Sequence, residues 1–156
     1  MATQHTILVP ITNSPASLQA VAIACTAAKA RKSKVYAVHV IEVLRSLPLN
    51  AEMEPEARRG EQLLRKAEAS GHDAGCQVIG ELLQARDAGQ AIVDEARERQ
   101  ADLIVMGIDH KPGLSDVEIG TAAQFVLKHA SCEVWVVRQG VNGHGHAHPE
   151  REHGRE

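Results

Sequence analysis

The stretch ADLIVMGIDHKPGLSDVEIGTAAQFVLKHASCEVWVVR, residues 101–138, decides the fold of this chain. Its apolar run at 103–106 is typical of a buried strand, and the run at 134–137 predicts a second one. After Gly120, apolar residues at helical spacing predict an amphipathic helix. The stretch therefore predicts a strand, a loop bounded by Gly107 and Gly120, a helix and another strand.

The loop between Gly107 and Gly120 has two interpretations. A glycine directly after a strand and another at a helix start bring bare backbone N–H groups close to an anion, which the helix N-terminus also attracts. That pattern indicates a phosphate site. The same two glycines also fit a plain turn and a helix cap. The residues alone leave both interpretations open.

The chain before this stretch repeats the alternation of strand and helix. Ser14 and Asp87 are predicted helix caps, with Pro15 at the first helical position, and Gly71 is predicted to close the second helix. The predicted elements are strands at 6–11, 34–41 and 76–83 and helices over 15–32, 56–69 and from 88 onward. Because such alternation with short connections makes a parallel sheet with helices on both faces, we predict an α/β fold.

Composition limits the classes of function. The 156 residues suffice for one domain, and the chain is 44% hydrophobic but only 2% aromatic, so its core consists of Val, Ile, Leu and Ala. A net charge of −3 gives no broad basic surface for nucleic acid or an anionic membrane. No apolar run approaches the roughly 20 residues that span a bilayer. We therefore expect a cytoplasmic protein that binds neither nucleic acid nor a membrane.

Cysteine and histidine residues offer few chemical signals. Cys25, Cys76 and Cys132 are far apart in the sequence and form no CxxC pair, so we predict buried thiols in a reducing cytosol. His39 lies inside an apolar strand and is predicted to be a core histidine bonded to a backbone group.

Residues 141–156 contain glycine, proline, histidine and charged residues, which predicts a disordered tail. Its histidines suit weak metal binding, and we predict no physiological metal site.

Four segments together resemble one known family. They are ILVPITNS at 7–14, VYAVHV at 35–40, DLIVMG at 102–107 and GTAAQFVLKHASCEVWVVR at 120–138. These segments are similar to the universal stress protein family, the UspA-like family. The last is the most specific, because the family's final helix habitually ends in His-Ala-x-Cys before a valine-rich strand and arginine.

The resemblance implies an architecture and a mode of assembly. It implies a single UspA-like domain over residues 1–140, a three-layer sandwich with a five-stranded parallel sheet of order 3-2-1-4-5, similar to the adenine nucleotide alpha hydrolases. In that order, ligands lie where the strand order reverses, between the loop at 12–14 and the Gly107 loop. The strand Glu133 to Arg138 is then an edge that invites pairing with a second copy. Trp135 fits either that interface or burial against its own helices.

A nucleotide site is implied with two departures. ATP-binding members carry Gly-x₂-Gly-x₉-Gly followed by Ser or Thr, and here Gly107, His110, Gly120 and Thr121 keep the spacing. His110 places a side chain where relatives have bare backbone, although a protonated imidazole can donate to phosphate. Thr12 stands where nucleotide-binding relatives have aspartate, and a hydroxyl supplies no carboxylate to the nucleotide or to a metal. The resemblance implies that a nucleotide would contact Pro10, Thr12, Ser14, Val40, Met106, Gly107, His110, Gly120 and Thr121.

Two hypotheses for function follow. The sequence favours a non-catalytic, dimeric stress-response module that binds an as yet unknown protein partner and carries a degenerate nucleotide loop. That loop contains three acidic residues, Asp109, Asp116 and Glu118, and one basic residue, Lys111. The excess negative charge opposes the binding of a triphosphate unless Mg²⁺ bridges the carboxylates and the phosphates. The alternative is a regulatory sensor that binds ATP, with Mg²⁺, or another adenine nucleotide.

The chain lacks the residues that enzyme classes with related folds require for catalysis or cofactor binding. A receiver domain needs acidic residues after the first strand and an aspartate after the third, and neither is present. A flavodoxin needs aromatic walls, and the chain holds one Trp, one Tyr and one Phe. The His-x-Gly-His signature of nucleotidyl transferases is absent. We expect no catalysis beyond a slow, incidental ATP hydrolysis.

Overall fold

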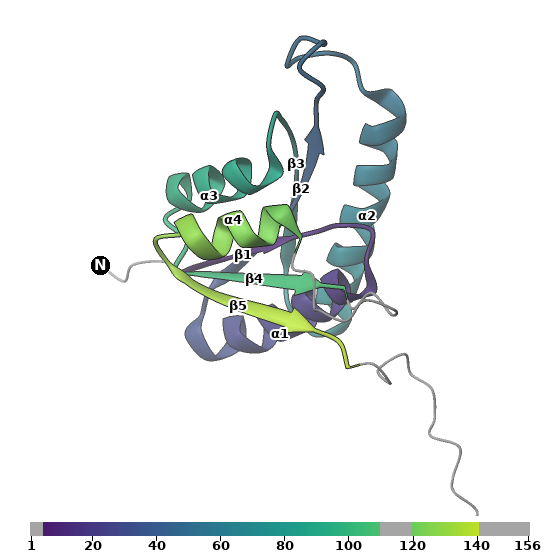
Figure 1. The fold of residues 1–156 in the computed structure, drawn as a ribbon. Coiled ribbons are helices and arrows are strands. Elements are labelled where there is room, and N and C mark those ends of the chain that lie inside the picture. The colour runs from purple at the N-terminus through teal and green to yellow at the C-terminus, as the bar shows by residue number, and fades with distance from the viewer. Residues whose placement is uncertain (1–4, 110–119, 141–156) are drawn as a thin grey trace, which may run out of the picture.

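A five-stranded parallel sheet lies at the centre of the computed structural model, which describes residues 5–109 and 120–140 (Figure 1). The strand order is β3-β2-β1-β4-β5, and every neighbouring pair is parallel. In chain order the elements are β1 (Thr6–Pro10), α1 (Pro15–Arg31), β2 (Lys34–Glu42), α2 (Glu54–Asp73), β3 (Val78–Ala85), α3 (Ala88–Glu98), β4 (Leu103–Ile108), α4 (Thr121–His129) and β5 (Glu133–Arg138). The predicted fold class and strand order are confirmed.

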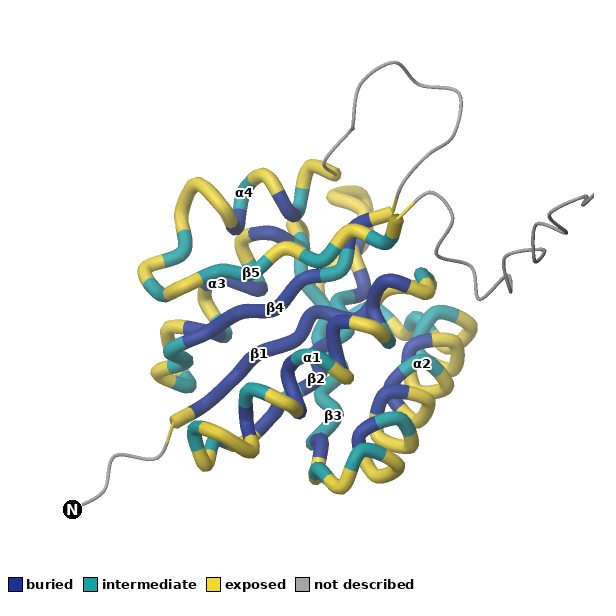
Figure 2. The backbone as a smooth tube through the Cα atoms, turned by 90° about the horizontal axis from the view of Figure 1, so that it is seen from below, coloured by how far each residue is buried: buried dark blue, intermediate teal, exposed yellow. Residues whose placement is uncertain are grey.

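Two pairs of helices cover the sheet, α1 and α2 on one face and α3 and α4 on the other (Figure 1). Successive residues of β1 alternate between the two halves of the core, because side chains along a strand point to opposite faces. Ile7 and Val9 pack on the α1 and α2 side, whereas Leu8 packs on the α3 and α4 side. The central strands β1 and β4 are the most buried part of the chain, and β5 at the edge is half-buried or exposed (Figure 2).

Local capping sets the starts of α1 and α3. The Ser14 side chain accepts a hydrogen bond from the backbone N–H of Ala16 at 3.1 Å. The Asp87 carboxylate accepts one from the N–H of Gln90 at 3.0 Å. Each bond satisfies a donor that the first helical turn leaves unpaired. Both predicted caps are confirmed.

The prediction for the end of α2 is wrong. The helix is longer than the predicted 56–69 and continues to Asp73, so Gly71 lies inside it. A methyl group at Gly71 would collide with the Val78 side chain and lie 3.1 Å from the Cys76 carbonyl oxygen. Gly71 is therefore needed where α2 packs closely against β3, and it is not a helix terminator. The third strand correspondingly begins at Val78.

The prediction that all three thiols are buried is only partly correct. Cys25 in α1 is fully buried, whereas Cys76 and Cys132 are half-buried. Burial raises the pKa of the Cys132 thiol above its ordinary value. The cysteines therefore differ in their access to solvent.

Candidate functional site

A cleft of about 430 Å³ lies at the carboxyl ends of β1 and β4, beside the start of α4. Ligands of parallel α/β sheets bind at such a position, where the strand order reverses. The cleft is lined by six of the residues predicted from sequence, namely Pro10, Thr12, Met106, Gly107, Gly120 and Thr121. It is also lined by residues that the prediction did not assign to the site: Ile92, Ile108, Asp109, Ala122, Ala123 and Gln124.

The residues that sequence reasoning missed are mostly small or apolar. Ile92 reaches the cleft from α3, a helix far from the glycine motif in sequence. Ala122 and Ala123 follow Thr121 in the first turn of α4, so their position could have been found from the predicted start of that helix. Ile92 offered no such signal, because its spacing marks it only as part of the inner face of α3.

Thr12 uses its polar groups within the protein. Its backbone N–H donates to the Ser17 hydroxyl oxygen at 2.9 Å, and the two hydroxyl oxygens lie 3.2 Å apart. Ser17 is 1% exposed, so Thr12 is the partner that satisfies this buried hydroxyl. Thr12 thus stabilises the turn into α1 and provides the cleft with a hydroxyl group, not a charge.

Ser14 connects the two loops that the strand order was expected to bring together. While its oxygen caps α1, its hydroxyl donates a hydrogen bond to the Asp109 carboxylate that follows β4. The 12–14 loop and the end of β4 therefore meet at the cleft. Asp109 is the single formally charged residue among the described residues that line the cleft.

Gly107 and Gly120 meet different needs. Gly107 lies within β4, and a methyl group there would collide with the Ala16 carbonyl and lie 2.8 Å from the Ser17 nitrogen. Its missing side chain lets α1 pack against β4. Gly120 is the N-cap of α4, with no heavy atom of the described residues within 4 Å of an added methyl group. The phosphate interpretation therefore has support at Gly120, whereas Gly107 is explained by packing alone.

The space that the described residues leave open at Gly120 lies beside a helix start. The first N–H groups of a helix have no acceptor within it, and the helix dipole places partial positive charge there. Thr121, Ala122 and Ala123 form this first turn of α4 and all line the cleft. Gly120 has no side chain, so the N-cap residue makes no side-chain hydrogen bond to this turn. This end of the cleft is suited to an anionic group.

Two of the predicted site residues, Ser14 and Val40, are not among the residues that line the cleft, and Ser14 lines a smaller neighbouring pocket. Val40 packs into the α3 and α4 half of the core and lines a different pocket, between β2 and α2. His39, which lines the same pocket, has its Nδ1 2.7 Å from the Ile11 carbonyl oxygen, so the predicted backbone bond is confirmed. His110 and the charged residues that follow it in the loop lie outside the described residues, as does the tail at 141–156.

Metal ligands do not gather in the described part of the chain. Across residues 5–109 and 120–140, no group of three or more His, Cys, Asp or Glu side chains could hold a metal ion. The histidines of the tail lie beyond those residues. The cleft itself contains one carboxylate, Asp109.

The strand order 3-2-1-4-5, the helices on both faces and the cleft at the switch point define a parallel α/β sandwich. A model of the universal stress protein family matches residues 4–138. The "Universal stress protein MJ0531" of Methanocaldococcus jannaschii is 34% identical over 139 residues, covering 85% of this chain and 81% of that protein. This chain belongs to the universal stress protein family.

Solved structures share the fold. The universal stress protein of Archaeoglobus fulgidus in complex with dAMP has a TM-score of 0.70 at 21% identity, covering 87% of this chain and 98% of that one. A universal stress protein in complex with cAMP has a TM-score of 0.67 at 23% identity, covering 88% of this chain and 98% of that one. At these identities the likeness establishes the fold.

Proposed function

We propose that this protein is a non-catalytic regulatory module that binds an adenine nucleotide in the cleft beside α4. The observation that carries the proposal is the N-terminus of α4 at Gly120, where the described residues leave open space and where the helix itself has no acceptor for its first N–H groups. The cleft volume of about 430 Å³ lies in the range of small-molecule sites. Two universal stress proteins of the same fold are described as complexes with dAMP and with cAMP.

The cleft favours a monophosphate over a magnesium–triphosphate complex. Thr12 supplies a hydroxyl, so the end of β1 offers no carboxylate to a cation. Asp109 adds a negative charge to the cleft, and its repulsion grows with each added phosphate. A single phosphate at the start of α4 gains from the helix dipole at the smallest electrostatic cost. The ligand class that fits is therefore an adenosine monophosphate.

The remaining walls of the cleft suit a base and a ribose. Ile92, Met106 and Ile108 provide apolar surface for a purine ring, in the manner of mostly apolar ligand pockets. Thr12 and Gln124 provide polar side chains beside that surface. The cleft therefore combines an apolar wall with an anion-binding end.

Calorimetry with Gly120 and Gly140 variants tests the proposal. Wild-type protein should bind AMP with a micromolar dissociation constant and bind ATP with Mg²⁺ more weakly. Gly120→Val should weaken AMP binding at least about tenfold, equivalent to about 1.4 kcal/mol. Gly140→Val is the matched control, because that glycine also has no heavy atom of the described residues within 4 Å, and it should bind as wild type does. Absence of binding to both nucleotides in the wild type would overturn the proposal.

A nucleotide-independent interaction module is the second candidate. It is the one that the sequence favours, through Thr12 and His110. The hydrogen bond from Ser14 to Asp109 adds a structural reason, since it joins the two loops that a nucleotide would have to contact. Under this candidate, stress signalling passes through a protein partner, and neither AMP nor ATP binds in the calorimetric test.

The proposed assembly is a homodimer formed through β5. This strand pairs only with β4 among the described residues, so one edge of its backbone is open. Val136 on this edge strand is 37% exposed. Trp135 packs against the α1 and α2 half of its own core, and Arg31 stacks over its ring at 5.3 Å, so Val136 is the better apolar candidate for an interface.

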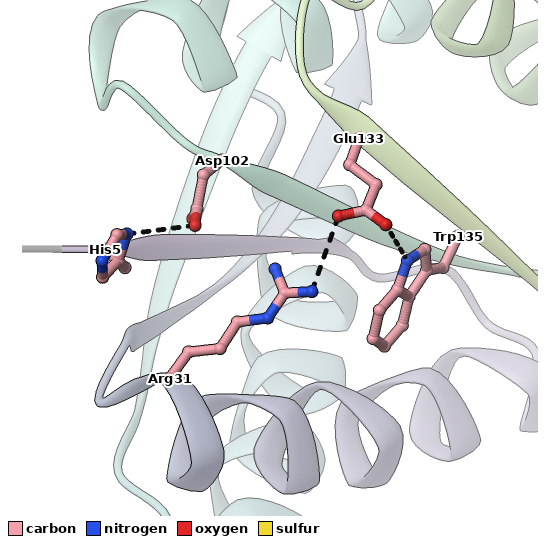
Figure 3. A network of polar contacts seen from close by, with 5 residues as sticks. All are labelled: His5, Arg31, Asp102, Glu133 and Trp135. Atoms are coloured by element: carbon pink, nitrogen blue, oxygen red, sulfur yellow. Dashed lines mark hydrogen bonds and ion pairs between the residues drawn. The ribbon is translucent and has the colours of Figure 1, made fainter.

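Figure 3 shows that the Arg31, Glu133 and Trp135 side chains contact one another between α1 and β5. The Trp135 Nε1 donates to the Glu133 carboxylate at 2.9 Å, which also lies 3.5 Å from the Arg31 guanidinium. These contacts connect β5 to α1, while the pairing with β4 keeps the strand extended.

Light scattering at tens of micromolar protein tests the dimer. The wild type should have the mass of two chains, and Val136→Lys should have the mass of one, because a charged side chain on an edge strand opposes pairing. Leu127→Lys on α4 is the control, since Leu127 is similarly exposed, at 45%, and lies off the strand. A monomeric wild type would contradict the β5 interface.

The proposal places the protein in the cytoplasm. Among the described residues, no helix has the length and apolarity that crossing a bilayer requires. The cysteines of the described chain are free thiols, as is usual in a reducing compartment. Fractionation of the producing cells, with the protein followed by immunoblot, tests this location.

A further inference from the structure

A second pocket of about 430 Å³ lies between the end of β2 and α2, the two elements that contribute most of its lining. Among the described residues, none that lines this pocket also lines the cleft beside α4, so the two are separate. Its volume is in the range of small-molecule sites. Most of its lining side chains are polar, and their chemistry indicates which ligand the pocket can take.

His39 of β2 provides this pocket with one nitrogen of defined role. Its Nδ1 lies 2.7 Å from the Ile11 carbonyl oxygen, and a carbonyl only accepts hydrogen bonds, so Nδ1 carries the hydrogen. In the neutral ring Nε2 is then an acceptor. Across residues 5–109 and 120–140, no group hydrogen-bonds to Nε2, and this atom is not sealed from solvent. A ligand in the pocket can therefore donate a hydrogen bond to Nε2.

Gly60 lets α2 lie directly against the His39 ring. A methyl group at Gly60 would collide with the ring, at 2.7 Å from Cδ2, and would lie 3.4 Å from Nε2. Because glycine has no side chain, α2 reaches the ring without this collision. Nε2 therefore lies beside the first half of α2, close to the side chains of that helix that line the pocket.

Two cationic side chains of α2 line the same pocket. Arg59 and Lys66 are two helical turns apart in sequence, so they lie on one face of α2, about 10 Å apart along its axis. Arg59 lies 3.7 Å from the Glu56 carboxylate, an exposed ion pair of little strength. Lys66 makes no hydrogen bond or ion pair with any other described residue. The two cations therefore keep much of their capacity to bind an anion.

Carboxylates balance these two positive charges. Glu42 and Glu56 also line the pocket, so its charged side chains, two of each sign, sum to zero. The Glu42 carboxylate already accepts a hydrogen bond from the backbone N–H of Ala88 at 3.0 Å. A ligand with one negative charge can bind at Arg59 and Lys66, whereas a second charge on the ligand adds repulsion from the carboxylates. The balance favours a monoanion over a phosphate dianion.

We propose that the pocket between β2 and α2 binds a small hydroxycarboxylate. The carboxylate of the ligand lies between Arg59 and Lys66, and one of its hydroxyl groups donates to Nε2 of His39. Leu63, which lies between the two cations on α2, contacts the carbon chain. A carboxylate alone leaves the Nε2 acceptor unused, and a neutral polyol leaves the cations unused. Binding here requires no nucleotide and is independent of the cleft beside α4.

Calorimetry on the full-length protein with four small molecules tests the proposal. D-Gluconate, which has a carboxylate and several hydroxyl groups, should bind with a dissociation constant below about 1 mM. Acetate lacks the hydroxyl groups, sorbitol lacks the charge, and glucose 6-phosphate carries a second charge. Each of these three should bind at least about tenfold more weakly than gluconate. A weaker gluconate complex than expected, or equal binding of any of the other three, would overturn the proposal.

Variants of α2 locate the site. Lys66→Gln should weaken gluconate binding at least about fivefold, because it removes one of the two cations. Arg65→Gln is the matched control, since it removes the same charge from the neighbouring exposed position, which does not line the pocket. It should bind gluconate as the wild type does. Equal losses in the two variants would reduce binding to a general effect of net charge and contradict the site.

Two measurements on the wild type test the contact with His39 and the separation from the cleft. In a protein with nitrogen-15-labelled histidine, gluconate should shift the Nε2 resonance of His39, because Nε2 gains a hydrogen-bond donor. AMP, the ligand proposed for the cleft, should not displace gluconate. An Nε2 resonance that stays unmoved at saturating gluconate, or displacement of gluconate by AMP, would overturn the proposal.

Discussion

The two sides of the cleft differ in how many of their hydrogen-bonding groups already have a partner within the protein. On the side of the 12–17 segment, Thr12 is bonded to Ser17, and Ser14 both caps α1 and contacts Asp109. On the side of α4, Gly120 provides no side-chain cap and has no heavy atom of the described residues within 4 Å of an added methyl group. The first side is a structural joint, in which the polar groups already have partners, whereas the described residues leave the second side open to a ligand.

This difference indicates which side of the cleft can contribute more to the affinity for a ligand. A ligand on the first side has to compete with hydrogen bonds that the protein already makes, and each has a net value of about 1 kcal/mol. At α4 a ligand meets donors that the helix itself cannot satisfy. Affinity for a phosphate should therefore depend on the start of α4, and stability should depend on the joint.

The largest effect is expected from Gly107→Ala. Its methyl group would collide with the Ala16 carbonyl, so α1 must shift from β4, and we expect a loss of about 1–3 kcal/mol in the free energy of unfolding. Gly120→Ala is the matched control, and its change should stay within about 0.5 kcal/mol because the space there is open. Urea unfolding measures both, and equal losses would remove the distinction between the two glycines.

A smaller effect is expected from Ser14→Ala. The change removes the cap of α1 and the contact with Asp109, and we expect a loss of about 1 kcal/mol in the free energy of unfolding. Asp109→Ala removes the contact but leaves the cap, so it should cost less. Denaturant unfolding of both variants separates the two roles, and a Ser14→Ala protein as stable as the wild type would contradict the structural joint.

The smallest effect is expected from Asp109→Asn. The amide oxygen can still accept from Ser14, but the negative charge in the cleft is lost. AMP affinity should rise a few-fold, and the gain should shrink as salt is added because the charge is exposed. Glu98→Gln, which removes an exposed carboxylate outside the cleft lining, is the control for calorimetry. Unchanged affinity in Asp109→Asn would show that this charge lies too far from the phosphate to matter.

Sequence reasoning predicted the elements better than the reasons for individual glycines. The alternation of apolar runs identified every strand and helix of the described chain, with errors at their ends such as the continuation of α2 to Asp73. Gly71 and Gly107 were interpreted as a terminator and a loop residue, whereas both are needed for close packing between elements. Sequence alone cannot separate these roles, because a turn, a cap and a packing contact all select for a missing side chain.

The candidate site was partly predictable for a related reason. Pro10, Met106 and Thr121 line the cleft as expected, since the order of strands determines which strand ends meet. Val40 does not line it, because its strand lies on the far side of β1 from β4. Ile92 lines the cleft because α3 packs beside it, and no sequence motif indicates that position.

By itself, the sequence determined the alternation of strands and helices, the caps at Ser14 and Asp87, and membership of a family, because these depend on periodicity and on bonds between residues close in the chain. Only the tertiary structure decided that the described residues leave Gly120 open and that Ser14 reaches Asp109. Those features join residues far apart in the chain, and their distances are set by how α1, α2 and α4 pack on the sheet.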